Sequence, residues 1–452
     1  MTWIESLQNT SIKTATSLAL SDSSFSYSEM LNLLQGAAKG GITQTEFSDL
    51  TSIYKNSIDF FSNDYVKNIT YNVILGNTAN STWWGGAKGI SDTSVLGDMS
   101  AGSSQLHAER LIGKWFLGLD LPMPLVGGDT ANAEASRGVY DYGDATGALF
   151  VNGIAATDIA QGSVGTCYLM AALGAVAHTS PQTIRDAIID NGNGSYGVRV
   201  FVDEQSVYTT VNQSLMVMPF SNRVVAAHDY GSGASLNGEL WVSLLEKAYA
   251  QLNSQVNIVE RQPSQWNQEN SYQAIEGGAG SPLRQFTNLG YDQYALANYY
   301  NPAGKTYSAS NPSTYKAQII EALSKGAIGY LASYKTLYNS SGQMTLIGSH
   351  GHMVLGYNAE TDKFIIRNPW GGPESNSRRV LQFELGIEEF WNKQVNPILW
   401  LTTSKSTVSF DYTVVSNSSN IGDATNEGEL IVVTVARDNS GSESTVYFDL
   451  TP

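Results

Sequence analysis

Residues 157–173 read TDIAQGSVGTCYLMAAL, and they place the only cysteine of the chain, Cys167, where a glycine-containing loop meets an apolar run. The apolar run predicts a helix that begins at Cys167. The unpaired N–H groups and the positive dipole end of a first helical turn favour both a thiolate and an oxyanion. We therefore predict Cys167 as a nucleophile and the side-chain amide of Gln161 as a second oxyanion donor. Without this context, a lone cysteine is more often a buried structural residue.

A second informative stretch covers residues 348–371, which read GSHGHMVLGYNAETDKFIIRNPWG. Two apolar runs around a polar turn predict a β-hairpin. A turn centred between residues 360 and 361 brings His352 opposite Pro369, one step from Asn368. The asparagine oxygen would then accept the imidazole N–H and fix the tautomer of the ring, as the orienting member of a triad should. Trp370 would shield that hydrogen bond from water.

Two histidines compete for the role of base in this hairpin. We predict His352, because it directly precedes the apolar strand and aligns with Asn368, whereas His350 is expected in the loop before the strand. The alternative for either residue is an ordinary loop histidine. Two histidines two residues apart can also share one face of a strand as metal ligands, but no cysteine or acidic cluster near them supports that interpretation.

These motifs resemble those of the calpain family of cysteine proteases. Residues 161–167 match the nucleophile motif Gln-Gly-x-x-Gly-x-Cys, Gly351-His352 match the base motif, and residues 368–371 match the motif Asn-Pro-Trp-Gly. Between them, residues 239–250 (ELWVSLLEKAYA) and 271–278 (SYQAIEGG) are similar to two further stretches of the family. The resemblance covers residues 145–402. It implies an α+β fold with a two-lobed papain-like core and a substrate cleft between the lobes.

The resemblance also implies contacts with substrate and metal. Gly278 and Gly351 would present backbone groups to the substrate chain, and Trp370 would also contact the substrate. The calcium ion of the helical lobe would be held by two backbone carbonyls and two carboxylates, those of Val151, Gly153, Asp158 and Glu239. The alternative is a solvated aspartate and a glutamate that caps a helix. A second calcium site of the family looks lost, because Glu374 remains without the later acidic ligands.

The sequence departs from the family pattern at several positions. Thr166 replaces an aspartate before the nucleophile, Tyr168 replaces a tryptophan after it, and Met353 replaces a small residue. The 16-residue step from His352 to Asn368 is shorter than in animal calpains. None of these changes removes a catalytic atom, but they leave calcium control and subsite preference open.

Residues 1–144 contain no catalytic motif. Their apolar periodicity predicts a mainly helical region, with helices over residues 25–36, 45–61 and 106–119. By its position, this region is interpreted as an inhibitory pro-segment or a targeting segment. If this region is inhibitory, deletion of residues 1–140 is expected to raise activity.

Residues 403–452 form a tail in which apolar and polar residues alternate. The alternation predicts strands over residues 407–415, 429–436 and 444–450. The last two resemble the first strands of a Calx-β domain. Because such a domain needs more residues than the tail has, we expect the chain to be a fragment of a longer protein.

The composition narrows the functional classes. The chain has 452 residues and a net charge of −16, which gives no electrostatic reason to bind nucleic acid. No apolar run is long enough to span a membrane, and the first residues lack a signal-peptide pattern. Low charge, abundant Asn, Ser and Thr, and the Calx-β resemblance favour secretion without such a signal, with the cytoplasm as the alternative.

We expect a monomeric cysteine endopeptidase that acts on proteins or peptides and uses calcium but no organic cofactor. Two other functions compete with it. One is a non-catalytic calpain-like binding module, and the other is a transferase or amidase with the same triad, because a fold and triad do not fix the substrate.

Overall fold

The computed structural model divides the chain into two compact units, residues 1–403 and 404–452. The described residues are 2–127, 138–259, 269–278, 282–295, 299–300, 306–307, 312–333, 335–392, 398–403, 430–436 and 443–449.

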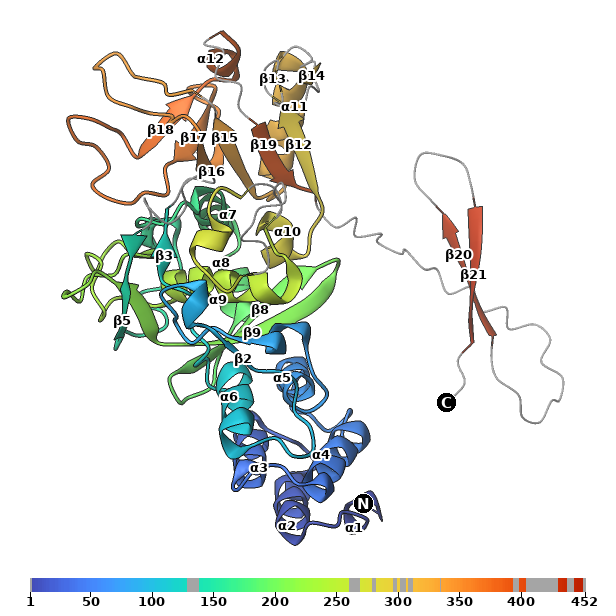
Figure 1. Ribbon diagram of the computed structural model, residues 1–452. Coiled ribbons are helices and arrows are strands. Elements are labelled where there is room, and N and C mark those ends of the chain that lie inside the picture. The colour runs from blue at the N-terminus through green and yellow to red at the C-terminus, as the bar shows by residue number, and fades with distance from the viewer. Residues whose placement is uncertain are drawn as a thin grey trace, which may run out of the picture. The chain divides into compact units, whose positions relative to one another are not determined.

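Six helices form the N-terminal part of the larger unit, shown in blue to cyan in Figure 1. They are α1 (Thr2–Glu5), α2 (Thr10–Ala19), α3 (Tyr27–Ala38), α4 (Gln44–Asn56), α5 (Asp64–Ile74) and α6 (Gln105–Trp115). Ser26 and Thr43 close capping boxes with Glu29 and Glu46, which explains why α3 and α4 begin where they do. The helix expected to reach residue 61 ends at Asn56. The apolar faces bury a core of their own, which includes Tyr208 from a later strand.

Four described helices follow in the part of the larger unit that carries the predicted nucleophile, namely α7 (Cys167–Thr179), α8 (Pro181–Ala187), α9 (Trp241–Val256) and α10 (Pro282–Thr287). Helix α7 begins at Cys167, and its residues 168–177 are all buried. It is therefore a core helix that exposes only its ends. A Cβ atom on Gly174 would lie 2.3 Å from Cε of Met353, so this glycine lets α7 pack closely against the adjacent sheet.

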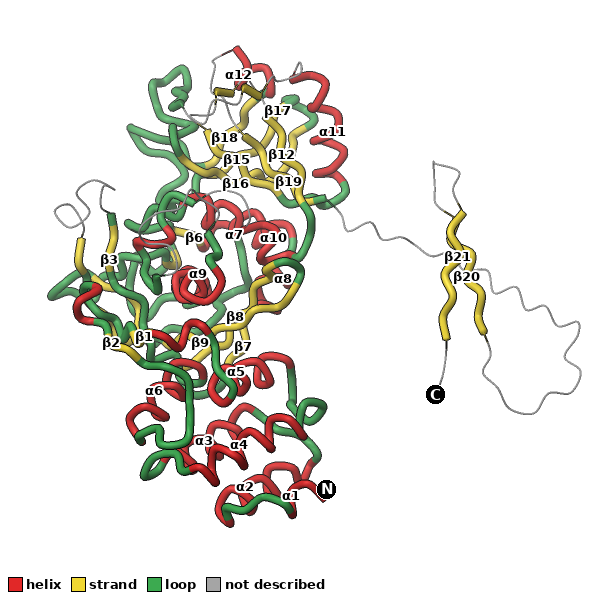
Figure 2. The backbone as a smooth tube through the Cα atoms, turned by 45° about the vertical axis from the view of Figure 1, so that its right-hand side comes forward, coloured by secondary structure: helices red, strands yellow, loops and turns green. Residues whose placement is uncertain are grey.

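A six-stranded antiparallel sheet in the order β12-β19-β15-β16-β17-β18 covers α7 (Figure 2). Its strands are β12 (Tyr291–Ala295), β15 (Gly329–Ser333), β16 (His350–Asn358), β17 (Lys363–Arg367), β18 (Gln382–Leu385) and β19 (Ile398–Thr402). Strand residues alternate between two cores. Tyr330, Met353 and Trp400 belong to the core that contains α7. Their neighbours Leu331, Val354 and Leu399 belong to a second core with helix α11 (Pro312–Ser324). Helix α12 (Ile387–Asn392) packs against α11.

Smaller antiparallel sheets complete the larger unit. Three strands pair in the order β7-β8-β9, which are Ile188–Asp190, Ser195–Val202 and Gln205–Asn212. The two-stranded pairs are β1–β2 (Thr82–Trp83, Ser94–Val95), β3–β4 (Leu125–Val126, Gly138–Val139), β5–β10 (Asp141–Asp144, Ser214–Val217), β6–β11 (Ile159–Ala160, His228–Asp229) and β13–β14 (Tyr299–Tyr300, Thr306–Tyr307). Short 3₁₀ turns are η1 (Leu20–Asp22), η2 (Thr78–Ser81), η3 (Ile90–Asp92), η4 (Ala156–Asp158) and η5 (Gln273–Ile275).

The smaller unit contains one described hairpin, in which β20 (Leu430–Ala436) pairs with β21 (Glu443–Asp449) and Val433 lies opposite Val446. The strand predicted over residues 407–415 lies outside the described residues.

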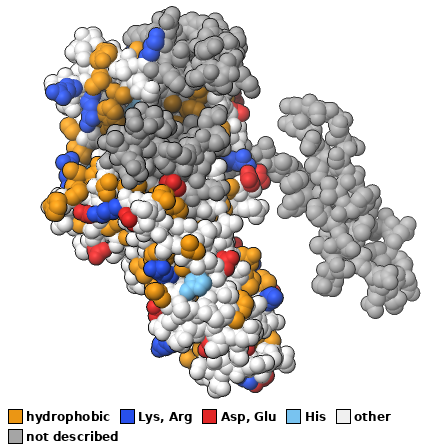
Figure 3. Space-filling model, viewed as in Figure 1, with side chains coloured by type: hydrophobic (Ala, Val, Ile, Leu, Met, Phe, Trp, Pro, Cys, Tyr) orange, Lys and Arg blue, Asp and Glu red, His pale blue; other side chains and the backbone are white. Residues whose placement is uncertain are grey.

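In the part of the chain that the structure describes, we find no helix both long and apolar enough to cross a lipid bilayer. Uncharged side chains and backbone cover much of the described surface in Figure 3, with charged groups scattered among them. This agrees with the 15% of residues that are charged.

Candidate active site

Cys167 is the first residue of α7, so its sulfur lies beside the unpaired N–H groups of the first turn. Burial raises the pKa of the Cys167 thiol, while hydrogen bonds from the backbone of Gly351, Tyr168 and Cys167 itself act in the opposite direction. The side chain remains half-buried rather than sealed in the core. It is therefore accessible, unlike the structural cysteine of the alternative interpretation.

Gly351 brings the start of β16 against the start of α7. A Cβ atom at this position would lie 2.9 Å from the carbonyl oxygen of Cys167 and 3.2 Å from Cα of Tyr168. A side chain would therefore push the strand away from the helix. The close approach places the neighbouring His350 at the same junction.

His350 is the histidine that binds Asn368. Its Nε2 lies 3.0 Å from Oδ1 of Asn368, and the backbone N–H of Trp370 donates to the same oxygen at 3.0 Å. Because this oxygen accepts, Nε2 of His350 carries the proton and Nδ1 is left as the basic nitrogen. The Trp370 ring packs 4.8 Å from the His350 ring, centroid to centroid. Burial lowers the pKa of His350 to about 4, against the opposing effect of the Asn368 bond.

The ring of His352, the predicted base, lies 4.9 Å from that of His350, centroid to centroid, but the contacts of His352 differ. It is fully buried, its ring is 6.2 Å from that of Phe383 in the second core, and its Nε2 accepts a 3.3 Å hydrogen bond from the backbone of Ile347. Burial lowers the pKa of His352 far below its ordinary value. Strand alternation places His350 and His352 on the same face of β16, opposite to Gly351 and Met353, which face α7, so alternation alone does not distinguish the two histidines. The structure thus brings His350, and not His352, to Asn368.

Gln161 is fixed at the junction of the helical and sheet regions. Its backbone N–H donates to Pro369 at 3.0 Å, and its Nε2 donates to the carbonyl of Val164 at 2.8 Å. The side-chain amide is buried, and one of its two N–H bonds is used by Val164. No described residue accepts from the second N–H.

Two glutamates that the sequence analysis did not single out support the nucleophile loop. Glu246 of α9 accepts hydrogen bonds from the hydroxyl of Thr166 and, at 2.7 Å, from the backbone of Ala227. Burial raises its pKa to about 7. Glu276 accepts from the backbone of Gly165 at 2.9 Å. Both lie in stretches that carry the family resemblance, but only the fold shows that they converge on this loop.

Gly278 lies on the other side of Tyr168, where a Cβ atom would be 2.4 Å from Cζ of that ring. The Tyr168 hydroxyl donates to the carbonyl of Ile275 at 2.9 Å. Gly278 and Gly351 therefore both lie close to the first turn of α7, and Trp370 lies beside His350.

Three acidic side chains from separate parts of the sequence come together in a cluster. One carboxylate oxygen each of Asp158, Asp229 and Glu239 lies within 4.8 Å of the others. Burial raises the pKa of Glu239 to about 7, and the charges of Asp158 and Asp229 add to this effect. Three carboxylate oxygens that repel one another are suitable ligands for a hard cation, which would neutralise their charges. Asp229 was missed because β11 brings it to Asp158 only through pairing with β6.

The loop that precedes this cluster is tied to it through N–H groups. Val151 donates to Oε1 of Glu239 at 2.5 Å, and Ala155 donates to Oδ2 of Asp158 at 2.7 Å. Gly153 lies between them at a φ of +105°. The structure thus brings Asp158, Glu239 and the Val151–Gly153 loop together.

Comparison with known proteins identifies the class. The family described as calpain family cysteine protease matches residues 143–379, which is more than half of the chain. The chain therefore belongs to the calpain family, and the resemblance found in the sequence is confirmed.

Individual relatives are distant. Mouse calpain-9 is 26% identical over 242 residues, covering 50% of this chain and 30% of the relative. The human calpain-1 catalytic subunit is 26% identical over 243 residues, covering 50% and 29%. The similarity thus spans less than a third of these curated relatives.

Proposed function

We propose that this chain is a cysteine endopeptidase with Cys167 as nucleophile, His350 as general base and acid, and Asn368 as the residue that orients the imidazole. The observation that carries the proposal is the bond from Nε2 of His350 to Asn368, formed where β16 meets the first turn of α7. This assigns the base to His350 in place of the expected His352. The helical region with α7 and the six-stranded sheet would be the two lobes of a papain-like core.

Nδ1 of His350 would take the thiol proton as Cys167 sulfur attacks the peptide carbonyl carbon. The backbone N–H of Cys167 and the side-chain amide of Gln161 would bind the resulting oxyanion. Collapse breaks the C–N bond, and His350 returns the proton to the leaving amine. Water, deprotonated by His350, then hydrolyses the thioester and releases the free enzyme.

Both catalytic groups are neutral in the structure as it stands. Burial raises the pKa of the Cys167 thiol and lowers that of His350 to about 4, so at pH 7 neither side chain carries a charge. Proton transfer would therefore accompany attack on the substrate rather than precede it. Asn368 stabilises the imidazolium that forms, because its oxygen holds the Nε2 proton.

We further propose that Asp158, Asp229 and Glu239 hold calcium, with the carbonyls of Val151 and Gly153 completing the site. The ion would neutralise three carboxylates that otherwise repel one another. Asp158 directly precedes β6, Asp229 is in its partner strand β11, and β6 leads directly into Gln161. The site would thereby stabilise the segment that carries an oxyanion donor.

The test is an assay of purified protein and its Cys167→Ala variant on casein, with calcium and with EGTA. The proposal expects cleavage of casein, or of the chain itself, by the parent protein alone, and loss of cleavage in EGTA. Equal cleavage by both proteins would contradict Cys167 as nucleophile. No cleavage by folded, calcium-loaded protein would favour a binding module, and transfer of the acyl group to an added amine without peptide hydrolysis would favour a transferase.

A further inference from the structure

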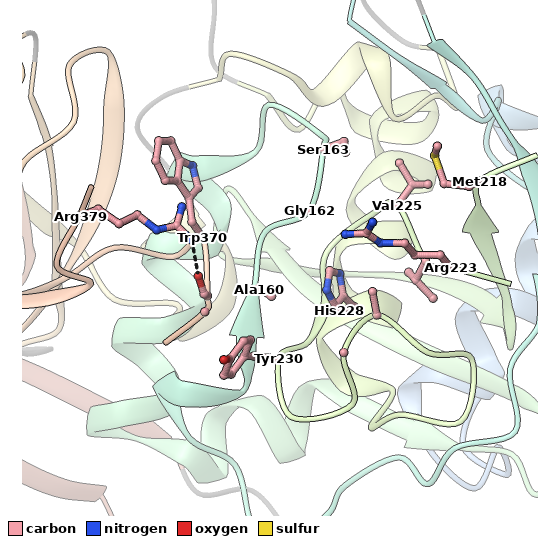
Figure 4. A pocket seen from close by; sticks show the side chains of 15 residues that line it. Ala160, Gly162, Ser163, Met218, Arg223, Val225, His228, Tyr230, Trp370 and Arg379 are labelled. Carbon is pink, nitrogen blue, oxygen red and sulfur yellow. Dashed lines mark hydrogen bonds between the residues drawn. The ribbon is translucent and has the colours of Figure 1, made fainter. Parts of the chain in front are cut away.

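A pocket of about 610 Å³ opens beside the proposed catalytic residues, at the junction of the helical and sheet regions. Figure 4 shows Trp370 and Arg379 on one side, Arg223 and His228 on the other, and Gly162 and Ser163 between them. The pocket is large enough for two or three residues of an extended peptide.

The pocket is lined by positive charges, whereas the chain as a whole is negatively charged. Two guanidinium groups line the pocket, and no Asp or Glu is among the described residues of its wall. The whole chain, by contrast, has a net charge of −16. A basic recess on an acidic protein attracts carboxylates locally, because low-dielectric walls concentrate the field of the charges.

Neither arginine is neutralised within the described part of the chain. Arg379 and Arg223 form no ion pair with any described residue, although several other Lys and Arg side chains do. Arg379 is held in place, because one nitrogen donates to the carbonyl of Gly371 at 3.2 Å and the guanidinium lies 5.3 Å from the Trp370 ring centre. Its Nε is buried and has no hydrogen-bond partner among the described residues. The guanidinium group of Arg379 is thus held in position, and not all of its N–H groups are used by described residues.

The pocket lies on the leaving-group side of the proposed reaction. His350 must protonate the leaving nitrogen, so the substrate residues after the scissile bond pass His350. Trp370 packs on His350 and forms a wall of the pocket. Gln161, the proposed oxyanion donor, is hydrogen-bonded to Pro369 and immediately precedes Gly162, which lies between the two sides of the pocket. A peptide held at Cys167 therefore reaches this pocket with the first residues that follow the cleaved bond.

We propose that Arg223 and Arg379 bind a substrate carboxylate on the leaving-group side of the scissile bond. The inference rests on the proposed peptidase function and adds a substrate preference to it. Two sources offer this chemistry, namely an Asp or Glu side chain soon after the cleaved bond, and a free C-terminal carboxylate at the same distance. Guanidinium groups suit both, because their planar donors match the two oxygens of a carboxylate.

The test uses a casein-derived peptide whose cleavage point is first located by mass spectrometry. Quenched fluorescent versions keep the residues before the bond and carry Glu, Gln or Lys at each of the first three positions after it, with an amidated C-terminus. A second pair carries Gln and ends three residues after the bond, with either a free carboxylate or an amide. The first set reports a side-chain carboxylate, and the pair reports a terminal one.

The parent protein is expected to cleave a Glu peptide, or the free-carboxylate peptide, with kcat/KM about tenfold above its neutral partner, as a charge-assisted hydrogen bond contributes. Combined Arg223→Gln and Arg379→Gln changes should abolish that preference, so that the charged and neutral peptides are cleaved with equal kcat/KM. The matched control is Lys325→Gln, which removes one exposed charge just after the C-terminal end of α11 and should keep the preference.

Equal rates for charged and neutral peptides, or a preference that survives the double change, would overturn the inference while leaving the peptidase function intact. If the parent protein cleaves neither casein nor any peptide, the proposed function fails first and the inference falls with it. Circular dichroism and thermal melting that match those of the parent protein show that the double variant is folded.

Discussion

Glu246 is a fully buried carboxyl group directly beneath the loop that precedes Cys167. It accepts a hydrogen bond from Thr166, the residue before the nucleophile, and burial raises its pKa to about 7. Thr166 occupies the position where the family has an aspartate. The Thr166 hydroxyl can donate a hydrogen bond to the carboxyl group of Glu246, which an ionised aspartate could not do. The replacement of aspartate by Thr166 is therefore compatible with the buried Glu246 below it.

Glu246 makes folding depend on pH. The folded protein keeps a proton on this group up to about pH 7, whereas the unfolded chain releases it near 4.5. The unfolded state therefore binds fewer protons between these values, and stability falls as pH rises through this window. We predict that Glu246→Gln reduces this decline by up to about 1.4 kcal/mol per pH unit, as measured by urea unfolding between pH 5 and 7.5. An unchanged slope would contradict the assignment.

Asp229 tests the cation site. If three carboxylates bind calcium, Asp229→Asn should weaken binding about tenfold, as loss of a ligand charge lowers affinity at such sites. Because the pKa of Glu239 is about 7, affinity should also rise from pH 6 to pH 8 as its proton is lost. Calorimetric titration of calcium into the Cys167→Ala protein measures both effects.

The control for this prediction is Asp59→Asn, an exposed residue of the N-terminal part. It should bind calcium as the parent does. Equal affinity of the Asp229 and Asp59 variants would exclude Asp229 from the site.

At the scale of elements, the hairpin of β16 and β17 shows which part of the strand pairing the sequence could predict. The predicted turn places Gly356 opposite Ile365, and this pair is present. A β-bulge between Val354 and Gly356 then shifts the register by one residue, so that Met353 pairs with Arg367. A single bulged residue has no reliable signal in an alternating sequence, and it changes which side chains meet at the strand ends.

Local patterns were sufficient for the start of α7 and for the partnership of a histidine with Asn368, because both depend on neighbouring residues. They could not choose between His350 and His352, because both lie on one face of β16 and the choice depends on which ring reaches Asn368 at the start of the strand. Asp229 and Glu246 were missed for a related reason. Each reaches its site only through contacts between elements far apart in the chain, Asp229 by strand pairing with β6 and Glu246 by the packing of α9.

The contact between β16 and α7 should control catalysis. Gly351→Ala would place a methyl group 2.9 Å from the carbonyl oxygen of Cys167 and displace His350 from the nucleophile. We expect kcat/KM for casein to fall by about 10²-fold, as sub-ångström displacements of catalytic groups can cause. Gly36→Ala is the control, because outside its chain neighbours and the backbone of its own helix no described atom lies within 4 Å of an added Cβ. Equal activity of the two variants would contradict the close packing.

At the scale of the whole molecule, the N-terminal helices are joined to the core by buried polar contacts. Asp120 forms a buried ion pair with Lys114 at 2.6 Å, and its carbonyl accepts a hydrogen bond from Asn270 at 2.9 Å. The hydroxyls of Tyr65 and Thr210 are 2.8 Å apart. Removal of one partner leaves such groups buried and unpaired, which is strongly destabilising.

These contacts change the expectation for a truncated protein. In place of the activation expected for an inhibitory segment, we predict that deletion of residues 1–140 yields protein that does not fold, because it exposes Tyr208, Thr210 and Asn270. Circular dichroism and thermal melting of the fragment measure this. A soluble fragment with a cooperative melt and raised activity would support the inhibitory interpretation instead.

The central claim is that His350 acts as the base for Cys167. The most direct test is kcat/KM on casein, with calcium, for the matched variants His350→Gln and His352→Gln, each checked for folding by circular dichroism. We predict a loss of about 10³-fold for His350→Gln and less than about tenfold for His352→Gln, whose amide oxygen can still accept from Ile347. Loss of activity in a folded His352 variant, with activity retained in the His350 variant, would contradict the account.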